Sequence, residues 1–103
     1  MKRILMGLTV ACILLPVSGT FAVAGPIERA CMSSPRKSAS WRLCGCIQRV
    51  ADQTLSRSDQ RVAAKFFVEP HKAQEIRQSD NTRHEAFWLR YKEFGVSAAA
   101  SCN

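Results

Sequence analysis

Residues 39–55 read ASWRLCGCIQRVADQTL, and the spacing of their apolar side chains predicts the central helix of the fold. A helix places every third or fourth residue on one face, whereas a strand of period two would divide the same residues between two faces. The residues that share the predicted buried face are Leu43, Ile47, Val50, Ala51 and Thr54. Cys44 and Cys46 flank this face on nearly opposite sides. We therefore expect the two cysteines to bond to different neighbours.

Shorter helices are predicted on both sides of this central helix. Pro26 is suited to a first helical turn and opens a segment that the run Ser33-Ser34-Pro35 ends. After the central helix, Ser58 is a candidate N-cap for a helix through residues 62–67. Pro70 then turns the chain and opens a further short helix to about residue 78. These last two segments form a bent helical pair.

The final segment combines a capping signal with an aromatic stripe. Thr82 and Glu85 have the spacing of a capping box, in which the two side chains satisfy backbone amides of the first turn. Gly95 weakens a helix by about 1 kcal/mol relative to alanine, so we expect a bend or fraying there. The whole pattern predicts an all-α fold, a small bundle of about four short helices. The stripe consists of Phe87, Tyr91, Phe94 and Ala98.

The first 24 residues have the pattern of an export signal. Lys2 and Arg3 precede the apolar residues 4–17, and Ala22-Val23-Ala24 supplies the small residues of a cleavage site. The mature protein is therefore expected to begin at Gly25, in the periplasm or secreted.

This division predicts a signal peptide over residues 1–24 and a single small helical domain over residues 25–103. Two alternatives would keep the protein on a membrane. The apolar run could be retained as an anchor, or the chain could be lipidated at Cys12. With the signal cleaved, no second hydrophobic span follows, and the mature chain is expected not to cross a membrane.

Four cysteines remain in the mature domain, which has 79 residues once 24 of the 103 are removed: Cys31, Cys44, Cys46 and Cys102. In a small exported domain they predict two disulfides, each typically stabilising by about 2 to 4 kcal/mol. We favour Cys31 with Cys44 and Cys46 with Cys102, which ties the first and last segments to the central helix. The exchanged pairing, Cys31 with Cys46 and Cys44 with Cys102, is nearly as consistent with the sequence.

A competing interpretation makes Cys44-Gly45-Cys46 a thiol-redox or metal-handling site of a periplasmic protein. Redox motifs more often have two intervening residues and a cysteine at a helix N-terminus, where the dipole lowers its pKa. The spacing also differs from that of zinc modules. His71 and His84, with Met32, could bind copper, but both histidines lie among polar residues typical of a surface. No cofactor or metal site is predicted.

The mature chain is basic, and its charges are dispersed. Without Lys2 and Arg3, 13 basic residues remain against eight acidic ones, a net charge of +5. Such a charge favours anionic partners through long-range attraction. Because the helical stripe must bury Phe87 and Tyr91, we predict no specific binding of nucleic acid. The candidate surface for a partner consists of Trp41, Trp88, Arg83, Arg90 and Lys92.

The sequence contains no hydrolase motif and no glycine-rich phosphate loop. We therefore predict a non-enzymatic protein that binds a partner protein or an anionic component of the cell envelope.

Several segments resemble a family of short exported bacterial proteins of unestablished function, and the likeness covers essentially the whole mature chain. Some members carry the label arginine transporter, which implies for this chain a role as soluble accessory of an arginine transport system. Capture of a cationic amino acid requires converging carboxylates, whereas the eight acidic residues are dispersed. The segments are GPIERAC at 25–31, LCGCIQ at 43–48, KFF at 65–67, PHKAQE at 70–75 and EAFW at 85–88.

Overall fold

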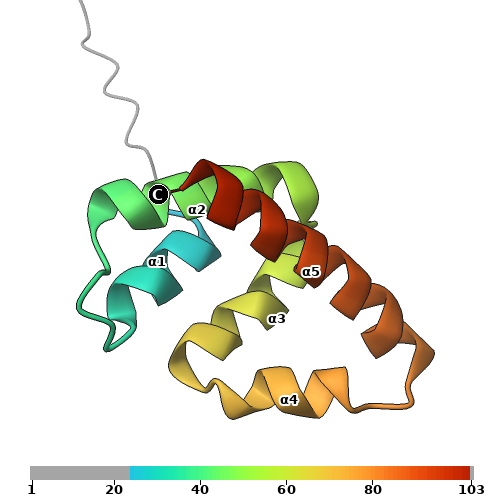
Figure 1. Cartoon of the computed structure of the whole chain (residues 1–103). Coiled ribbons are helices and arrows are strands. Elements are labelled where there is room, and N and C mark those ends of the chain that lie inside the picture. The colour runs from blue at the N-terminus through green and yellow to red at the C-terminus, as the bar shows by residue number, and fades with distance from the viewer. Residues whose placement is uncertain (1–23, 103) are drawn as a thin grey trace, which may run out of the picture.

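The computed structural model describes residues 24–102, so the predicted export signal lies outside the described residues except for Ala24 (Figure 1). All regular structure in this range is helical, which confirms the all-α prediction. The predicted bent pair resolves into two separate helices. The five helices are α1 (Pro26–Ser33), α2 (Trp41–Thr54), α3 (Arg57–Val68), α4 (His71–Arg77) and α5 (Thr82–Ser101).

The N-caps of α3 and α5 differ from the predicted ones. Ser56, not Ser58, caps α3, and its hydroxyl accepts a hydrogen bond of 3.1 Å from a backbone N–H of the first turn. Asn81, not Thr82, caps α5 through a similar bond of 2.8 Å. A capping residue needs an extended backbone, which Ser56 and Asn81 have, whereas Ser58 and Thr82 already lie within the helices.

The helix α5 continues without interruption through Gly95 to Ser101, so the predicted bend or fraying is absent. Phe94 just before the glycine is buried, and Ala98 after it packs against the core. The chain is also bonded covalently to α2 at Cys102. These attachments on both sides of Gly95 outweigh its low helix propensity.

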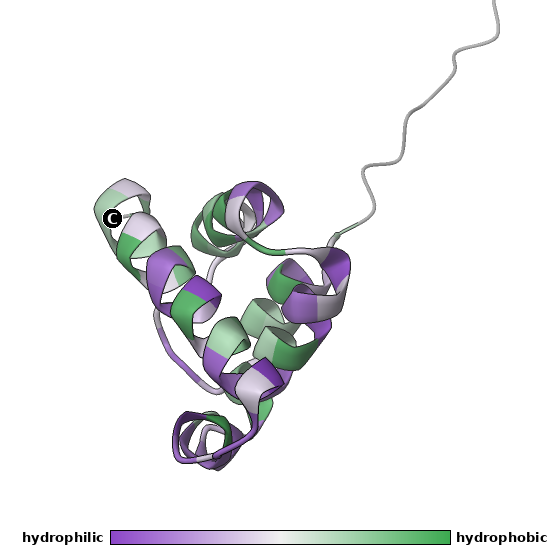
Figure 2. Cartoon of the chain, turned by 90° about the vertical axis from the view of Figure 1, so that its right-hand side faces the viewer, coloured by the Kyte–Doolittle hydropathy of each residue, from purple (hydrophilic) through white to green (hydrophobic). Residues whose placement is uncertain are grey.

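The helices enclose one core. The short helix α1 packs against α2 and α3, α5 packs against α2, and α4 spans the gap between the ends of α3 and α5 (Figure 1). Hydrophobic and hydrophilic residues alternate around the helices, as Figure 2 shows. The buried apolar residues come from every helix except α4: Ile27, Cys31, Cys44, Val50, Ala51, Leu55, Ala63, Phe66, Phe87 and Phe94.

The buried face of α2 is rotated relative to the predicted stripe. Val50 and Ala51 are buried as predicted, but Leu43, Ile47 and Thr54 are only half-buried. The deepest positions instead follow the line that faces α1 and the start of α3, where a disulfide and a polar network hold the helices together. Besides Val50, which is 6 % exposed, they are Cys44, Gln48, Ala51 and Leu55, exposed by 0, 7, 0 and 5 %.

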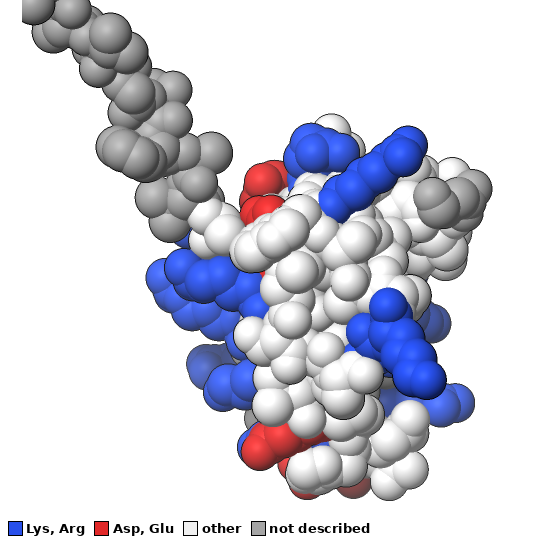
Figure 3. Space-filling model, turned by 90° about the vertical axis from the view of Figure 1, so that its left-hand side faces the viewer, with Lys and Arg blue, Asp and Glu red and all other residues white. Residues whose placement is uncertain are grey.

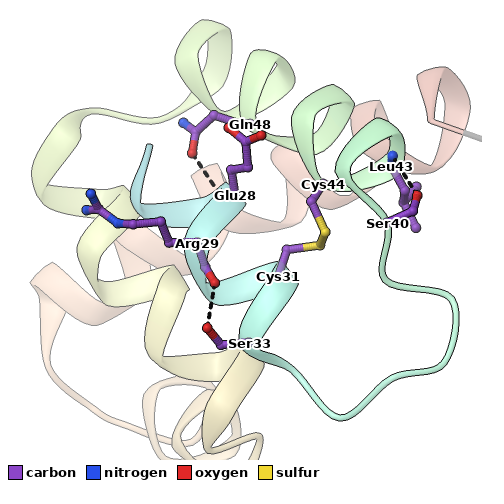
Figure 4. Close-up of a disulfide and its surroundings, with 8 residues drawn as sticks. All are labelled: Glu28, Arg29, Cys31, Ser33, Ser40, Leu43, Cys44 and Gln48. Atoms are coloured by element: carbon purple, nitrogen blue, oxygen red, sulfur yellow. Dashed lines mark hydrogen bonds between the residues drawn. A yellow bond between two sulfur atoms is a disulfide. The ribbon is translucent and has the colours of Figure 1, made fainter. Parts of the chain in front are cut away.

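Gln48 is the centre of a hydrogen-bond network that the sequence did not predict. Its Oε1 accepts from the backbone N–H of Glu28 at 3.0 Å, and its Nε2 donates to Oε1 of Gln60 at 2.8 Å and Oδ1 of Asp52 at 2.9 Å (Figure 4 shows the Glu28 bond). The Gln60 amide donates to Asp52 at 3.1 Å and to the Leu55 carbonyl at 3.3 Å. The network joins α1, α2 and α3, and it satisfies polar groups that would be costly to bury alone.

Candidate functional site

Two disulfides connect the four cysteines in the favoured pairing, which confirms that prediction. Cys31 is bonded to Cys44, joining α1 to α2, with 5.6 Å between their Cα atoms (Figure 4). Cys46 is bonded to Cys102, joining α2 to the residue after α5, with 5.8 Å between the Cα atoms. Cys44 and Cys46 therefore bond to different neighbours on opposite flanks of α2.

These bonds bear on the redox and metal alternatives, because every cysteine sulfur in the described domain is already paired. Cys44 is fully buried and Cys31 nearly so, while Cys46 and Cys102 are half-buried. The Cys46 sulfur approaches the Ser101 carbonyl at 3.6 Å, but a disulfide sulfur has no proton to donate, so this is only a contact. Over residues 24–102, no three His, Cys, Asp or Glu side chains are grouped to hold a metal.

The structure separates the five residues of the predicted partner surface. Trp41 is 65 % exposed at the start of α2, far along the chain from the other four residues on α5. Trp88 is half-buried, with its ring 5.3 Å from that of Tyr91. Lys92 is exposed outside the main cleft, whose lining includes Arg83 and Arg90. Only these two arginines are brought together at one concave site.

That site is a cleft of about 720 Å³ between α3, α4 and α5, within the size range of small-molecule sites. Apolar side chains from all three helices contribute to its lining: Val62, Phe66, Ile76, Ala86 and Phe87. The polar side chains include four cations, two carboxylates and a histidine: Lys65, Lys72, Arg83, Arg90, Asp59, Glu75 and His84. The lining therefore combines apolar surface with an excess of positive charge.

Side chains rather than close backbones connect α3 and α5 across this cleft. The Phe66 ring lies edge-on to the rings of Phe87 and Tyr91, with centroids 6.0 and 5.1 Å away. Arg90 donates to both carboxylate oxygens of Asp59, at 2.6 Å from Nε and 3.1 Å from Nη2. Long side chains thus hold the two helices together while leaving space beside them.

The charges of the cleft differ in how they are paired. Hydrogen bonding to Asp59 raises the pKa of Arg90, which keeps that guanidinium charged and engaged. Lys72 lies 3.4 Å from Glu69 in an exposed ion pair. The ion pairs of the described domain do not include Lys65 or Arg83. These two cations, one on α3 and one on α5, are the ones most available to an anionic ligand.

Of the histidines and the tyrosine near these helices, only His84 lines the cleft. His84 Nδ1 lies 2.7 Å from the Ser79 hydroxyl, which links α5 to the loop before it. His71 is exposed at the start of α4. Burial raises the pKa of the Tyr91 phenol, and nearby Arg36 lowers it by a smaller amount. The neutral phenol is therefore favoured within the aromatic cluster.

Sequence reasoning identified Arg83 and Arg90 but missed the residues that α3 and α4 contribute to the cleft. Lys65 and Ile76 lie on helices whose facing sides no local pattern specifies. Pro70 was the available signal, because a turn between two short helices must leave them at an angle to each other. Charge alone was no guide, since Figure 3 shows Lys and Arg side chains in separate groups with uncharged surface between them.

Two further observations bear on this domain. Within residues 24–102, the helices lack the combined length and apolar character that a bilayer crossing requires. Comparison with protein-family models, with curated proteins and with solved structures found no match.

Proposed function

We propose that this protein is an exported, non-enzymatic binding protein whose cleft between α3, α4 and α5 holds an amphiphilic anion, such as a lipid-derived carboxylate or phosphate of the cell envelope. The observation that carries the proposal is the combination of an apolar lining with an excess of cations in one concave site. Pockets of this kind bury the apolar part of a ligand and use a few polar groups to orient it.

The apolar part of the ligand would contact the floor of the cleft. Phe66 and Phe87 are 6 and 5 % exposed, and their rings are held edge-on to each other, so this floor is rigid. Ile76 supplies the opposite wall from α4. Removal of an acyl chain from water onto such a surface is favourable by about 0.8 kcal/mol for each buried CH₂ group.

The anionic group would be held by Lys65 and Arg83. A guanidinium binds a carboxylate or phosphate through two parallel hydrogen bonds, and an ammonium adds a point charge. Four cations against two carboxylates give the lining a net charge of +2. The positive lining repels a cationic ligand such as free arginine. In addition, one of its two carboxylates, Asp59, is already engaged by Arg90.

Binding is tested by titrating the protein with dodecanoate and dodecyl phosphate below their micelle concentrations. Trp88 is the reporter, since its ring contacts the Tyr91 ring and so the aromatic floor, and a Trp41→Phe background removes the exposed tryptophan. We expect saturable changes with both anions, and weaker ones with neutral dodecyl maltoside or dodecyltrimethylammonium. A preference between the two anions would distinguish a carboxylate from a phosphate source.

A matched pair of double variants locates the site. Lys65→Gln with Arg83→Gln removes two cleft cations and is expected to raise Kd about tenfold or more. Lys37→Gln with Arg61→Gln makes the same changes at exposed positions outside the cleft and is expected to leave Kd within about twofold. Absence of saturable binding, or equal weakening in both variants, would show that the cleft is not the site.

Export is tested by the intact mass of the protein recovered from a bacterial host, with thiol-blocking reagent added before and after reduction. We expect a chain that begins at Gly25, lacks two hydrogens for each of its two disulfides, and reacts only after reduction. A retained or lipid-modified N-terminus would place the protein on a membrane. Free thiols at Cys44 and Cys46 would favour the redox or metal alternative.

A further inference from the structure

The outward side of α5 carries an apolar stripe that the monomer leaves uncovered. Leu89 and Val96 are 64 and 72 % exposed. Because they lie seven residues apart, about two turns, their side chains point in nearly the same direction. Ala100 follows one turn later and is also exposed. Phe87 and Phe94 of the same helix are buried on the opposite side, so α5 presents apolar residues on both of its faces. In Figure 2, α5 lies at the margin of the molecule with no helix beyond it.

Two opposite charges flank this stripe symmetrically. With about 100° of rotation for each residue, Lys92 lies about 50° to one side of the line between Leu89 and Val96, and Glu93 about 50° to the other. Both side chains are exposed, and the ion pairs of the described domain do not include them. Between Leu89 and Val96 the face is therefore an apolar line with a cation along one edge and an anion along the other. Glu85, exposed one turn before Leu89, lies about 30° from this line on the Lys92 side.

We propose that this face is the contact surface of a parallel, two-fold symmetric dimer of the chain, in which α5 packs alongside α5 of a second copy. A two-fold axis parallel to the helices brings the cationic edge of one copy against the anionic edge of the other. Two equivalent ion pairs then form, each between Lys92 of one copy and Glu93 of the other, at nearly the same position along the helix axes. Leu89 and Val96 each meet the same residue of the second copy. An antiparallel arrangement would instead place like charges against each other.

The small number of large apolar residues limits the strength of this contact. One helix face with Leu89 and Val96 at its centre buries less surface than a permanent interface, so the dimer belongs among weak, reversible ones. We expect a dissociation constant on the order of 100 µM. The dimer leaves the cleft residues Lys65 and Arg83 outside the contact, so it stands independently of the proposed ligand.

Sedimentation equilibrium of the mature chain over a range of concentrations tests the dimer, and charge reversal tests its geometry. Glu93→Lys places two cations opposite each other at both symmetric positions and is expected to raise the dissociation constant about tenfold. The double variant Lys92→Glu with Glu93→Lys restores both pairs with their signs exchanged, and should recover the original constant. Asp80→Lys, an exposed reversal in the loop between α4 and α5 and outside the cleft, is the matched control and should leave the constant unchanged.

The outcomes are distinct. A chain that stays monomeric at millimolar concentration overturns the proposal. A dimer that Glu93→Lys leaves unchanged, or that the double variant fails to restore, overturns the parallel arrangement. Circular dichroism of each variant confirms that the exposed substitutions leave the helices intact, so a lost dimer is not mistaken for a lost fold.

Discussion

Replacing Cys46 and Cys102 together with alanine is expected to lower the free energy of unfolding by about 4 kcal/mol, against about 3 kcal/mol for replacing Cys31 and Cys44. The two bridges differ in the length of chain they close, because the partners are 56 residues apart in the first pair and 13 in the second. A longer closed loop restricts the unfolded chain more strongly, so its loss frees more entropy.

Urea unfolding of the two double variants, followed by circular dichroism, measures the difference. Both variants change two cysteines to two alanines, so each is the chemical control of the other. Burial opposes the loop effect, because Cys44 is fully buried and its replacement also removes packed sulfur. A larger loss for the Cys31 and Cys44 pair would therefore show that packing, not loop closure, dominates the contribution of these bridges.

The same variants separate a structural role of the cysteines from a redox role. Neither disulfide contributes a residue to the cleft between α3, α4 and α5. If the bridges are structural, variants that remain folded at low temperature should bind dodecanoate with unchanged affinity while melting earlier. If Cys44 and Cys46 perform redox chemistry, Cys44→Ser would abolish that function without a matching loss of stability.

The features that the sequence predicted correctly are those set by short-range rules. Helix boundaries near Pro26 and Pro70 depend on the fixed φ of proline. The positions of Cys44 and Cys46, two residues apart on one helix, predicted that they bond to different partners, but left the exchanged pairing nearly as consistent. The buried stripe of α5 was likewise correct at Phe87 and Phe94, because aromatic residues at helical spacing leave few alternatives.

The features that were missed depend on which helices meet. The buried face of α2 includes Gln48, which the predicted stripe did not, because α1 and α3 both supply polar partners to its side chain. A glutamine carries no sequence signal of burial. The cleft arises because α3 and α5 are joined through the long side chains of Phe66 and of the Asp59–Arg90 pair, which keep their backbones at a distance from each other. These distances depend on contacts between residues about 20 to 30 positions apart, which local patterns do not encode.

Gln48→Ala is expected to lower the free energy of unfolding by about 3 kcal/mol, because it leaves buried hydrogen-bonding groups without partners and opens a cavity. The backbone N–H of Glu28 and Oε1 of Gln60 would lose the bonds that they now make with this side chain. Gln48 is only 7 % exposed and Gln60 2 %, so water replaces these bonds poorly. Urea unfolding measures the loss, and a change under about 1 kcal/mol would contradict the role given to this network.

Gly25 tests how rigidly this network holds Gln48. A Cβ built on Gly25 would overlap the Gln48 side-chain amide. The backbone of Gly25, with φ −72° and ψ 171°, suits any residue, so the overlap rather than backbone strain is the obstacle. A free glutamine would swing aside, but this one is fixed by three hydrogen bonds. We therefore expect Gly25→Ala to cost about 2 kcal/mol.

A double-mutant cycle separates the overlap from the other effects of Gly25→Ala. In a Gln48→Ala background the overlap is gone, so the added cost of Gly25→Ala should fall to the N-cap preference, about 1 kcal/mol or less. Gly95→Ala is the matched control, because a Cβ there meets nothing within 4 Å, and it should stabilise the protein by about 1 kcal/mol. Equal costs for Gly25→Ala in both backgrounds would mean that Gln48 yields to the added methyl group, and that the network adapts instead of fixing the position of α1 against α2.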